Sequence, residues 1–289
     1  MTTLPQFMHH PRDWRANRYV YPVVSRRSGG ISIGINLNPD KACNFDCIYC
    51  QVDRTTPPVV REVDAGVLEV ELREMLRRVI DGRLAREPEF AGLPEHLVRL
   101  RDIAFSGDGE PTACKTFAEC VALTAGVKRS LRLDDVKIVV ITDAAYLTRP
   151  KVEEGLALLD RERSEIWAKL DAGTEEYYRR INRPNVPLRH VLDEILACAR
   201  RRPVVIQSLF MRVDGVGPDD KELTAYIAAL NGVTYAGGRL ARVQVYTVAR
   251  KPAEPSVTPL SAAEVDYVAA RVRAETGLAV EAYYGPSEI

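Results

Sequence analysis

Short apolar runs alternate along this chain with longer stretches in which apolar residues recur at helical spacing. The run GISIGINL at 30–37 predicts a strand, and the apolar positions of 66–80 recur with the spacing of an amphipathic helix. The run VKIVVIT at 136–142 is continuous enough to predict a strand buried on both faces. By the same pattern we expect further strands over 101–105, 166–170, 204–209, 243–248 and 278–283.

Helical signals stand between these strands. Helical patterns or helix-start residues occur at 115–127, Pro150, Thr174, Pro187, 218–230 and Ser261. Repeated alternation of strand and helix predicts parallel strands with right-handed crossovers. Six strand–helix units of this kind build either an open doubly wound sheet or a partial barrel, and in both folds the site lies at the carboxyl ends of the strands.

No linker, internal repeat or low-complexity tract divides the chain. We expect an irregular basic and aromatic arm over 1–29, an α/β body over 30–250, and a C-terminal helix and tail over 251–289 that packs on the body. Within the arm, Arg26 and Arg27 are candidates for contacting an anionic substrate. The plainer interpretation is a solvated extension, because basic runs are usually solvated.

Composition narrows the class of protein. A hydrophobic fraction of 46% excludes wholesale disorder, and 40 basic residues against 40 acidic ones argue against a general electrostatic grip on nucleic acid or membrane. No apolar run reaches the roughly 18 residues of a membrane helix, and the first residues lack the apolar core of a signal peptide. We therefore expect a cytoplasmic protein, in whose reducing environment clustered cysteines indicate a metal or catalysis before disulfides.

Cys43, Cys47 and Cys50 lie in the loop after the first predicted strand, with the spacing C-x3-C-x2-C. Cysteines at short spacing in one loop are typical ligands of iron–sulfur clusters. A four-iron cluster on three cysteines leaves one iron open to a small molecule, as an open catalytic metal position does. Two alternatives are three cysteines packed along one helix face, and a structural zinc site completed by Cys114.

A second loop, FSGDGEPT, follows the second predicted strand. Glycines at 107 and 109 let the backbone approach a ligand, and the acceptor on Glu110 suits a ligand ammonium group. The ends of the later strands also carry polar candidates for the same site. With this loop, the candidate set is Gly107, Asp108, Gly109, Glu110, Thr142, Asp143, Lys169, Asp171, Gln207 and Tyr246.

The cysteine spacing, with an aromatic residue directly before the last cysteine, resembles the radical S-adenosylmethionine (SAM) superfamily. The resemblance implies a partial (β/α)6 barrel, a [4Fe-4S] cluster on the three cysteines, and SAM bound at the open iron. It also implies cleavage of SAM to a 5′-deoxyadenosyl radical that abstracts hydrogen from a substrate. By resemblance, the 107–110 loop contacts the methionine amino group, Lys169 and Asp171 contact the ribose, and Tyr49, Tyr246 and Val248 flank the adenine.

Three stretches resemble a branch of the superfamily, the Fe–S oxidoreductases related to wyosine synthase: CNFDCIYCQVDR, FSGDGEPT and KLDAGTEEYYRRINRP. Two departures stand out. The pattern Gly-x-Ile-x-Gly is absent from the fifth strand, which reads VVIQSLF. No cysteine precedes Cys43, and Cys114, Cys120 and Cys198 are better explained as packed thiols, so we expect no second cluster.

The main functional hypothesis is a radical SAM enzyme acting on an unidentified anionic small molecule, peptide or RNA, with flavodoxin or ferredoxin as reductant. The alternatives are an activase that makes a glycyl radical on a partner protein, a tRNA-base-modifying enzyme of the wyosine-synthase type, and a non-enzymatic electron carrier. Carriers generally close their cluster with four ligands. The expected substrate contacts are Arg26, Arg27, Lys41 and Arg212.

Overall fold

The computed structural model describes residues 4, 6, 14–252 and 254–285. Its main element is an eight-stranded sheet in the order β1-β2-β3-β4-β5-β6-β8-β10. The strands are β1 (Val20–Ser25), β2 (Gly30–Ile35), β3 (Leu100–Phe105), β4 (Lys137–Thr142), β5 (Ser164–Lys169), β6 (Val204–Leu209), β8 (Leu240–Tyr246) and β10 (Val280–Tyr283). From β2 to β10 all neighbouring strands are parallel, and β1 alone pairs antiparallel, with β2.

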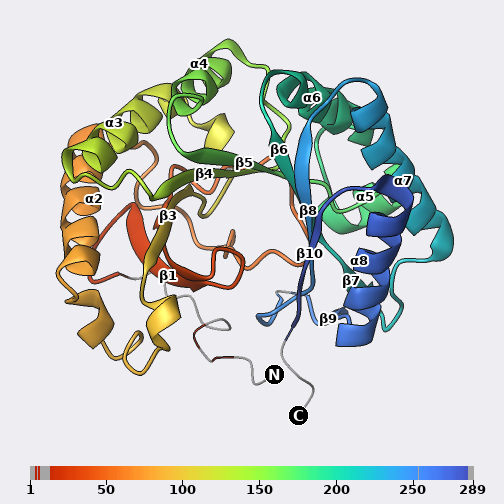
Figure 1. Ribbon diagram of the computed structural model, residues 1–289, viewed down its shortest axis with the longest axis horizontal. Helices are drawn as coiled ribbons and strands as arrows, with labels where there is room; N and C mark the ends of the chain where they lie inside the picture. The colour runs from red at the N-terminus through yellow and green to blue at the C-terminus, as the bar shows by residue number, and fades with distance from the viewer. Residues whose placement is uncertain (1–3, 5, 7–13, 253, 286–289) are drawn as a thin grey trace.

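The sheet curls into a partial barrel whose convex side is covered by helices (Figure 1). The helices are α2 (Ala65–Ile80), α3 (Phe117–Ser130), α4 (Pro150–Leu159), α5 (Glu175–Asn182), α6 (Leu188–Arg201), α7 (Asp220–Tyr235) and α8 (Ala262–Thr276). Single 3-10 turns are η1 (Leu84–Arg86), η2 (Glu95–Leu97) and η3 (Pro111–Ala113), and β7 (Met211–Val213) pairs with β9 (Val257–Pro259) in a separate small sheet. Because β1 and β10 are the two edges of the main sheet, the barrel stays open between them. The partial barrel predicted from the sequence is therefore confirmed.

Helix boundaries follow local chemistry. Thr174 accepts a hydrogen bond from the backbone N–H of Tyr177, and Ser261 and Glu264 form a reciprocal capping box at the start of α8. Pro150 occupies the first turn of α4, where its missing N–H has no cost. Among the described residues, no helix combines the length and the apolar character needed to cross a membrane.

The segment 20–25 corrects the expectation of an irregular arm, because it forms β1. Glu71 of α2 fixes the start of this strand by accepting the backbone N–H groups of Arg18, Tyr19 and Val20 at 2.7, 2.9 and 3.1 Å. Pro22 lies within β1, and because β1 is an edge strand, a residue without an N–H is tolerated there. The basic segment that follows β1 is therefore a hairpin turn held against the barrel.

Side-chain alternation divides the sheet into two unlike faces. The convex face carries apolar residues such as Ile103, Val140 and Ile206, which belong to the large core under the helices. The concave face holds only a small apolar cluster, made of Ala104, Val139, Trp167 and Val205 with Ile141 against it. The prediction that the strand at 136–142 is buried on both faces is confirmed, because Ile138, Val139 and Val140 are all fully buried.

Charged residues close the amino-terminal end of the barrel interior. Glu165 on β5 pairs with Lys137 on β4 at 3.0 Å and with Arg242 on β8 at 2.7 Å. Arg242 in turn pairs with Glu281 on β10 at 3.1 Å. The indole N–H of Trp167 donates to Glu165 at 2.7 Å. Because these ion pairs close the amino-terminal end, the barrel interior is accessible from the carboxyl ends of the strands.

Candidate functional site

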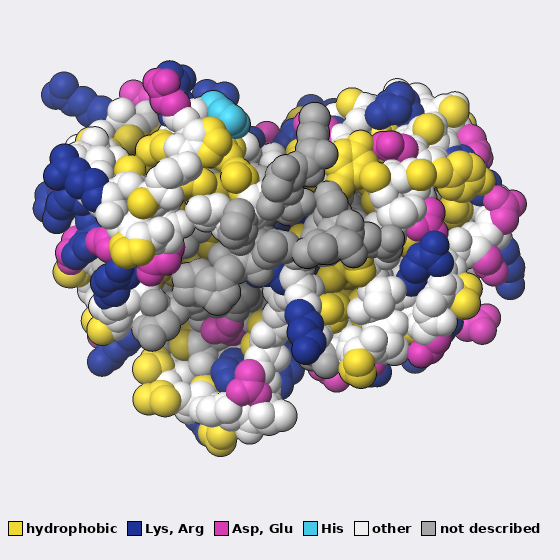
Figure 2. All heavy atoms as spheres, turned by 90° about the horizontal axis from the view of Figure 1, so that it is seen from below, with side chains coloured by type: hydrophobic (Ala, Val, Ile, Leu, Met, Phe, Trp, Pro, Cys, Tyr) yellow, Lys and Arg dark blue, Asp and Glu magenta, His cyan; other side chains and the backbone are white. Residues whose placement is uncertain are grey.

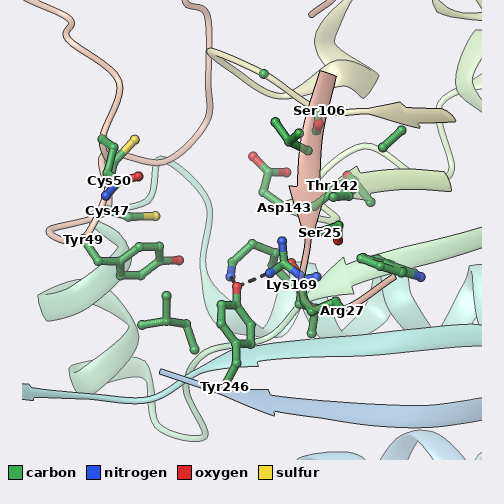
Figure 3. A pocket seen from close by; sticks show the side chains of 18 of the residues that line it. Ser25, Arg27, Cys47, Tyr49, Cys50, Ser106, Thr142, Asp143, Lys169 and Tyr246 are labelled. Atoms are coloured by element: carbon green, nitrogen blue, oxygen red, sulfur yellow. Dashed lines mark hydrogen bonds between the residues drawn. The ribbon is translucent and has the colours of Figure 1, made fainter. Parts of the chain in front are cut away.

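A cavity of about 330 Å³ occupies the barrel interior between the cysteine loop and the β1–β2 turn. It brings together most of the residues that the sequence singled out (Figure 3). The predicted residues that line it are Arg26, Arg27, Cys43, Cys47, Tyr49, Cys50, Gly107, Gly109, Glu110, Thr142, Asp143, Lys169, Gln207, Tyr246 and Val248. Asp108 and Asp171 stand behind this lining, and Lys41 and Arg212 lie away from it.

The cysteine loop, residues 38–50, has no regular helix, so the alternative of three cysteines on one helix face is wrong. Its backbone is held on both sides. The N–H groups of Asp46 and Ile48 donate to carbonyls at the end of α5 at 3.0 Å each, and the Ala42 carbonyl accepts the N–H of Glu110 at 3.0 Å. Phe45 packs edge-on against Tyr178 with ring centroids 5.6 Å apart. The loop is therefore fixed by tertiary contacts.

All three cysteines of this loop are free thiols. Burial, with the nearby carboxylates, raises the pKa of Cys43 and of Cys47 to about 12. Two donors face the sulfurs: Asn182 Nδ2 lies 3.3 Å from Cys47 Sγ, and Arg54 Nη2 lies 3.9 Å from Cys50 Sγ. Such donors stabilise a thiolate once a metal displaces the proton, and hydrogen bonds to sulfur also tune cluster potentials.

The donor set distinguishes a cluster from a single ion. Among the described residues, no three His, Cys, Asp or Glu side chains are gathered to hold one metal ion, which does not support the zinc alternative with Cys114. In a four-iron cluster each cysteine binds a different iron, so its ligands surround the group instead of meeting at one point. Three free thiols spread along one wall of a shared cavity fit such a cluster.

Asp171 organises the wall beside the cysteines. It is buried, and its carboxylate accepts from Tyr49 Oη at 2.5 Å, from Asn182 Nδ2 at 3.0 Å and from the Leu209 N–H at 2.8 Å. Lys169 Nζ lies 3.0 Å from the same carboxylate and donates to Tyr246 Oη at 2.7 Å. Asp171 therefore holds Tyr49 and Lys169 in position and offers no oxygen directly to the cavity.

The lysines are not placed as amine nucleophiles. Burial lowers the pKa of Lys169, but Asp171 and Tyr246 outweigh it and raise the pKa above its usual range, so the group stays protonated. Lys41 lies outside the cavity and donates to the backbone carbonyls of Asp53 and Thr56. Arg212 is also remote, because it pairs with Glu264 of α8 at 2.6 Å. Lys41 and Arg212 are thus not brought to the site.

The glycines of the second loop line the cavity and also have a packing role. A Cβ at Gly109 would lie 2.0 Å from the Ala42 carbonyl oxygen, and one at Gly107 would lie 2.4 Å from Asn36 Oδ1. Asn36 also holds Asp108, through bonds of 2.8 Å to its carboxylate and 3.1 Å from its N–H. The missing side chain of Gly109 therefore allows this loop to pack directly against the cysteine loop, and that of Gly107 allows close contact with Asn36, directly after β2.

The sequence indicated Glu110 as the acceptor for a ligand, but in the described structure Glu110 accepts from the protein itself and Asp143 has the unsatisfied oxygen. Glu110 is saturated, because it accepts from Thr142 Oγ1 at 2.6 Å, from the Asp143 N–H at 2.6 Å and from Thr112. Asp143 is also buried, yet within the described part of the chain its Oδ2 has no hydrogen-bond partner. Burial and the nearby Glu110 raise the pKa of Asp143 well above its usual range. Asp143 is the acid of the cavity lining whose buried Oδ2 no donor of the described residues satisfies.

Several site residues escaped the sequence analysis. Asn182, at the end of α5, bonds to Cys47 and Asp171, and nothing in its local sequence signals this. Ser32, Asp102 and Trp167 also line the cavity, and their alternation on the concave face of the strands was the available signal.

The three remaining cysteines lie outside the cavity lining. Cys120 and Cys198 are buried, as expected for packed thiols, whereas Cys114 is half-buried. Cys114 and Cys120 also share Thr116, at 3.4 and 3.8 Å from its hydroxyl. A hydrogen bond from Cys120 lowers the pKa of Cys114 to about 6.

Comparison with known proteins finds relatives that match part of their length. No family model matches the chain. A UPF0026 protein of Methanocaldococcus jannaschii is 32% identical over 61% of this chain and 46% of its own length. A UPF0026 protein of Helicobacter pylori is 26% identical over 79% of this chain and 65% of its own length. The chain therefore spans less than two thirds of either relative.

Solved structures share the architecture at low sequence identity. A radical SAM methyltransferase from Sphaerobacter thermophilus superposes with a TM-score of 0.61 at 16% identity, covering 92% of this chain and 69% of that one. SuiB from Streptococcus suis bound to S-adenosylmethionine gives 0.58 at 10% identity, covering 90% and 52%. TYW1 with a lysine–pyruvate adduct bound gives 0.50 at 17% identity, covering 91% and 78%. The chain thus has the fold of the radical SAM superfamily, as its cysteine and glycine loops indicated.

Proposed function

We propose that this protein is a radical SAM enzyme in which Cys43, Cys47 and Cys50 hold a [4Fe-4S] cluster and the adjoining cavity binds SAM. The observation that carries this proposal is convergence. Three free cysteines of one loop and the polar carboxyl ends of β3, β4, β5, β6 and β8 line a single cavity. When bound, the cluster supplies the electron that cleaves SAM to methionine and a 5′-deoxyadenosyl radical.

The chain's own groups bind and orient. Asn182 and Arg54 donate toward Cys47 and Cys50 and so stabilise their thiolates. Asp143, whose buried Oδ2 lacks a hydrogen-bond donor among the residues described, accepts from the ammonium group of the methionine part. The positive charge of that group favours the ionised form of the Asp143 carboxylate. Glu110 is a positioning residue, because its oxygens hold Thr142 and the Asp143 backbone.

The nucleoside part has a separate set of contacts. The rings of Tyr49 and Tyr246 both face Lys169 Nζ, at 5.3 and 5.1 Å from the ring centroids. We assign these rings and the backbone of Val248 to the adenine, and Lys169 to the ribose. Asp171 acts through Tyr49 and Lys169, so it is a positioning residue. A one-electron donor such as flavodoxin or ferredoxin completes the reaction.

Anaerobic reconstitution with iron and sulfide, followed by incubation with SAM and dithionite, tests the proposal. We expect 5′-deoxyadenosine from the wild type, and none above background from Cys47→Ala, which should also lose bound iron. Cys198→Ala is the matched control, because Cys198 is a buried thiol of α6 outside the cavity lining. This variant should keep both its bound iron and the formation of 5′-deoxyadenosine. Absence of 5′-deoxyadenosine from the wild type, or its persistence in Cys47→Ala, would contradict the proposal.

A further inference from the structure

The cavity has a second end, opposite the cysteines, made by Arg26, Arg27, Ser32 and Asp102; we call it the arginine end. Figure 3 shows Cys47 and Cys50 on one side of the cavity, Arg27 and Ser25 on the other, and Lys169 between them. We propose that the arginine end is the substrate subsite and that it binds a small molecule through a carboxylate or phosphate group. This inference rests on the proposed function, since it assigns the substrate of that same cavity.

Arg27 is held in the cavity by aromatic rings. Its guanidinium carbon lies 4.9 Å from the ring centroid of Tyr246 and 5.7 Å from that of Trp167. These contacts orient the planar guanidinium while leaving its N–H groups available in the plane. No ion pair found among the described residues includes Arg27 or Arg26. A planar guanidinium fixed in this way is suited to bidentate recognition of an oxyanion.

Arg26 adds a second positive charge at the same end. Its guanidinium donates to the backbone carbonyl of Tyr284, a neutral partner. Arg26, Arg27 and Arg250 all line the cavity. Burial, together with the charges of Arg27 and Arg250, lowers the pKa of Arg26 to about 10. An anionic ligand would relieve that repulsion.

Asp102 gives the arginine end an acceptor as well. It is only 1% exposed; its Oδ1 accepts from the Ser32 hydroxyl, and its Oδ2 has no partner within the described ranges. A buried polar atom without a partner is costly, so an unpaired carboxyl oxygen beside a cavity indicates a ligand that donates to it. The expected substrate therefore carries a hydroxyl or amino group in addition to its oxyanion.

Enclosure favours a small molecule over RNA. Arg15, in the preceding arm, is neutralised by Glu87 at 2.6 Å and Glu89 at 3.5 Å and so presents no free charge to a phosphate backbone. On the face in Figure 2, basic side chains are interspersed with acidic ones. Arg26 and Arg27 instead line the interior of the barrel. A macromolecular grip needs exposed cations, whereas these are partly buried.

Calorimetric titration of the reconstituted protein tests this subsite. SAM is present, so that its own subsite is filled, and the reductant is omitted. Inorganic phosphate, malonate and bulk transfer RNA are the probes, and sodium chloride at equal ionic strength is the reference. We expect saturable binding of phosphate or malonate, weakened at least about tenfold in Arg27→Gln and in Arg26→Gln. Arg15→Gln, an arginine outside the cavity, should bind as the wild type does.

The pattern of results decides the substrate class. Stronger binding of phosphate indicates a phosphorylated substrate, and stronger binding of malonate indicates a carboxylate. The proposal is overturned if the wild type binds neither anion saturably, or if both glutamine variants, shown folded by circular dichroism, bind like the wild type. It is also overturned if transfer RNA binds tightly and Arg15→Gln, not Arg27→Gln, abolishes that binding.

Failure of this subsite is distinguishable from failure of the proposed function. Loss of anion binding with intact reductive cleavage of SAM removes the subsite and leaves the radical SAM assignment. Anion binding without 5′-deoxyadenosine formation removes the radical SAM assignment and leaves the anion subsite. If Arg27→Gln does not fold, Arg26→Gln and the wild-type titration still decide the outcome.

Discussion

The two ends of the cavity differ in how the chain builds them. The cysteine end comes from one short loop, and its reactive groups are neutral thiols facing the acids Glu110 and Asp143. The arginine end comes from a hairpin turn and the concave faces of two strands, and positive charge dominates it. An acidic end beside the thiols and a basic end across the cavity can hold two ligands of different charge in one orientation.

The separation also explains the role of Lys169 and Asp171 between the two ends. Their ion pair of 3.0 Å links β5 to Tyr49 in the cysteine loop and to Tyr246 on β8. This ion pair neutralises Lys169 from the protein side, so that in the proposed subsite Lys169 would not compete with Arg26 and Arg27 for a substrate oxyanion. Four substitutions test this division, from the largest expected effect to the smallest.

Asp171→Asn should have the largest effect. It leaves the Lys169 charge without its buried partner, and we expect the free energy of unfolding to fall by about 3 kcal/mol or more. SAM binding should weaken as well, because asparagine keeps only one acceptor oxygen, whereas Tyr49 and the Leu209 N–H donate to different oxygens of the carboxylate. Urea unfolding measures the stability and calorimetry measures SAM binding.

The control is Asp193→Asn, which breaks an exposed ion pair with Arg189 on α6 and should change the free energy of unfolding by less than about 0.5 kcal/mol. Equal behaviour of the two variants would contradict the central role of Asp171.

Gly109→Ala tests the contact between the two loops of the cysteine end. The added Cβ would fall 2.0 Å from the Ala42 carbonyl oxygen, so the cysteine loop must move. We expect a loss of about 1–3 kcal/mol in the free energy of unfolding and a lower iron content after reconstitution. The matched control is Gly126→Ala in α3, where nothing lies within 4 Å and alanine should add about 0.5–1 kcal/mol. A Gly109→Ala variant that binds iron normally would show that the contact is dispensable.

Asp102→Asn probes the arginine end through pH. Burial raises the pKa of Asp102, and the nearby Glu165 adds to this, while the hydrogen bond from Ser32 and the charge of Lys137 act against it. Because the folded state holds the proton more tightly than the unfolded chain, this group's contribution to stability is lost as pH rises through its folded pKa. The variant should therefore gain stability relative to the wild type from pH 4.5 to 7, by at most about 1.4 kcal/mol per pH unit. Denaturant unfolding across this range measures it, and a difference that is flat or reversed would contradict the assigned shift.

Ser32→Ala should have the smallest effect. It removes one hydrogen bond to Asp102 and should lower the free energy of unfolding by about 1 kcal/mol. The loss should grow at higher pH, where Asp102 is charged and needs the donor more. Thermal unfolding at two pH values measures this, and a pH-independent loss would place the hydroxyl's role elsewhere.

Much of the cysteine end could be read from the chain. The spacing of Cys43, Cys47 and Cys50 and the glycines at 107 and 109 are local patterns, and the structure places them on one cavity. The structure adds to their roles: Gly109 also allows loop packing, and within the described ranges the unsatisfied acceptor is on Asp143 and not on Glu110. Such details depend on which oxygen is already satisfied, which no local pattern reports.

The arginine end was only partly predictable. Arg26 and Arg27 were candidates because of charge alone, and their segment was expected to be an irregular arm. The structure shows a hairpin turn at the open edge of the barrel, since β1 pairs with β2 and Glu71 of α2 caps the start of β1. The parallel register of β2 with β3 brings Ser32 against Asp102, 70 residues away.

By itself the sequence determined the alternation of strands and helices, the parallel α/β class and the three clustered cysteines, because periodicity and spacing are local properties of the chain. Tertiary structure alone decided that the barrel stays open between β1 and β10, that Asn182 reaches Cys47 across 135 residues, and that the arginines line the interior. The physical reason is that strand register and sheet curvature decide which distant residues meet, and these depend on packing of the whole sheet against its helices.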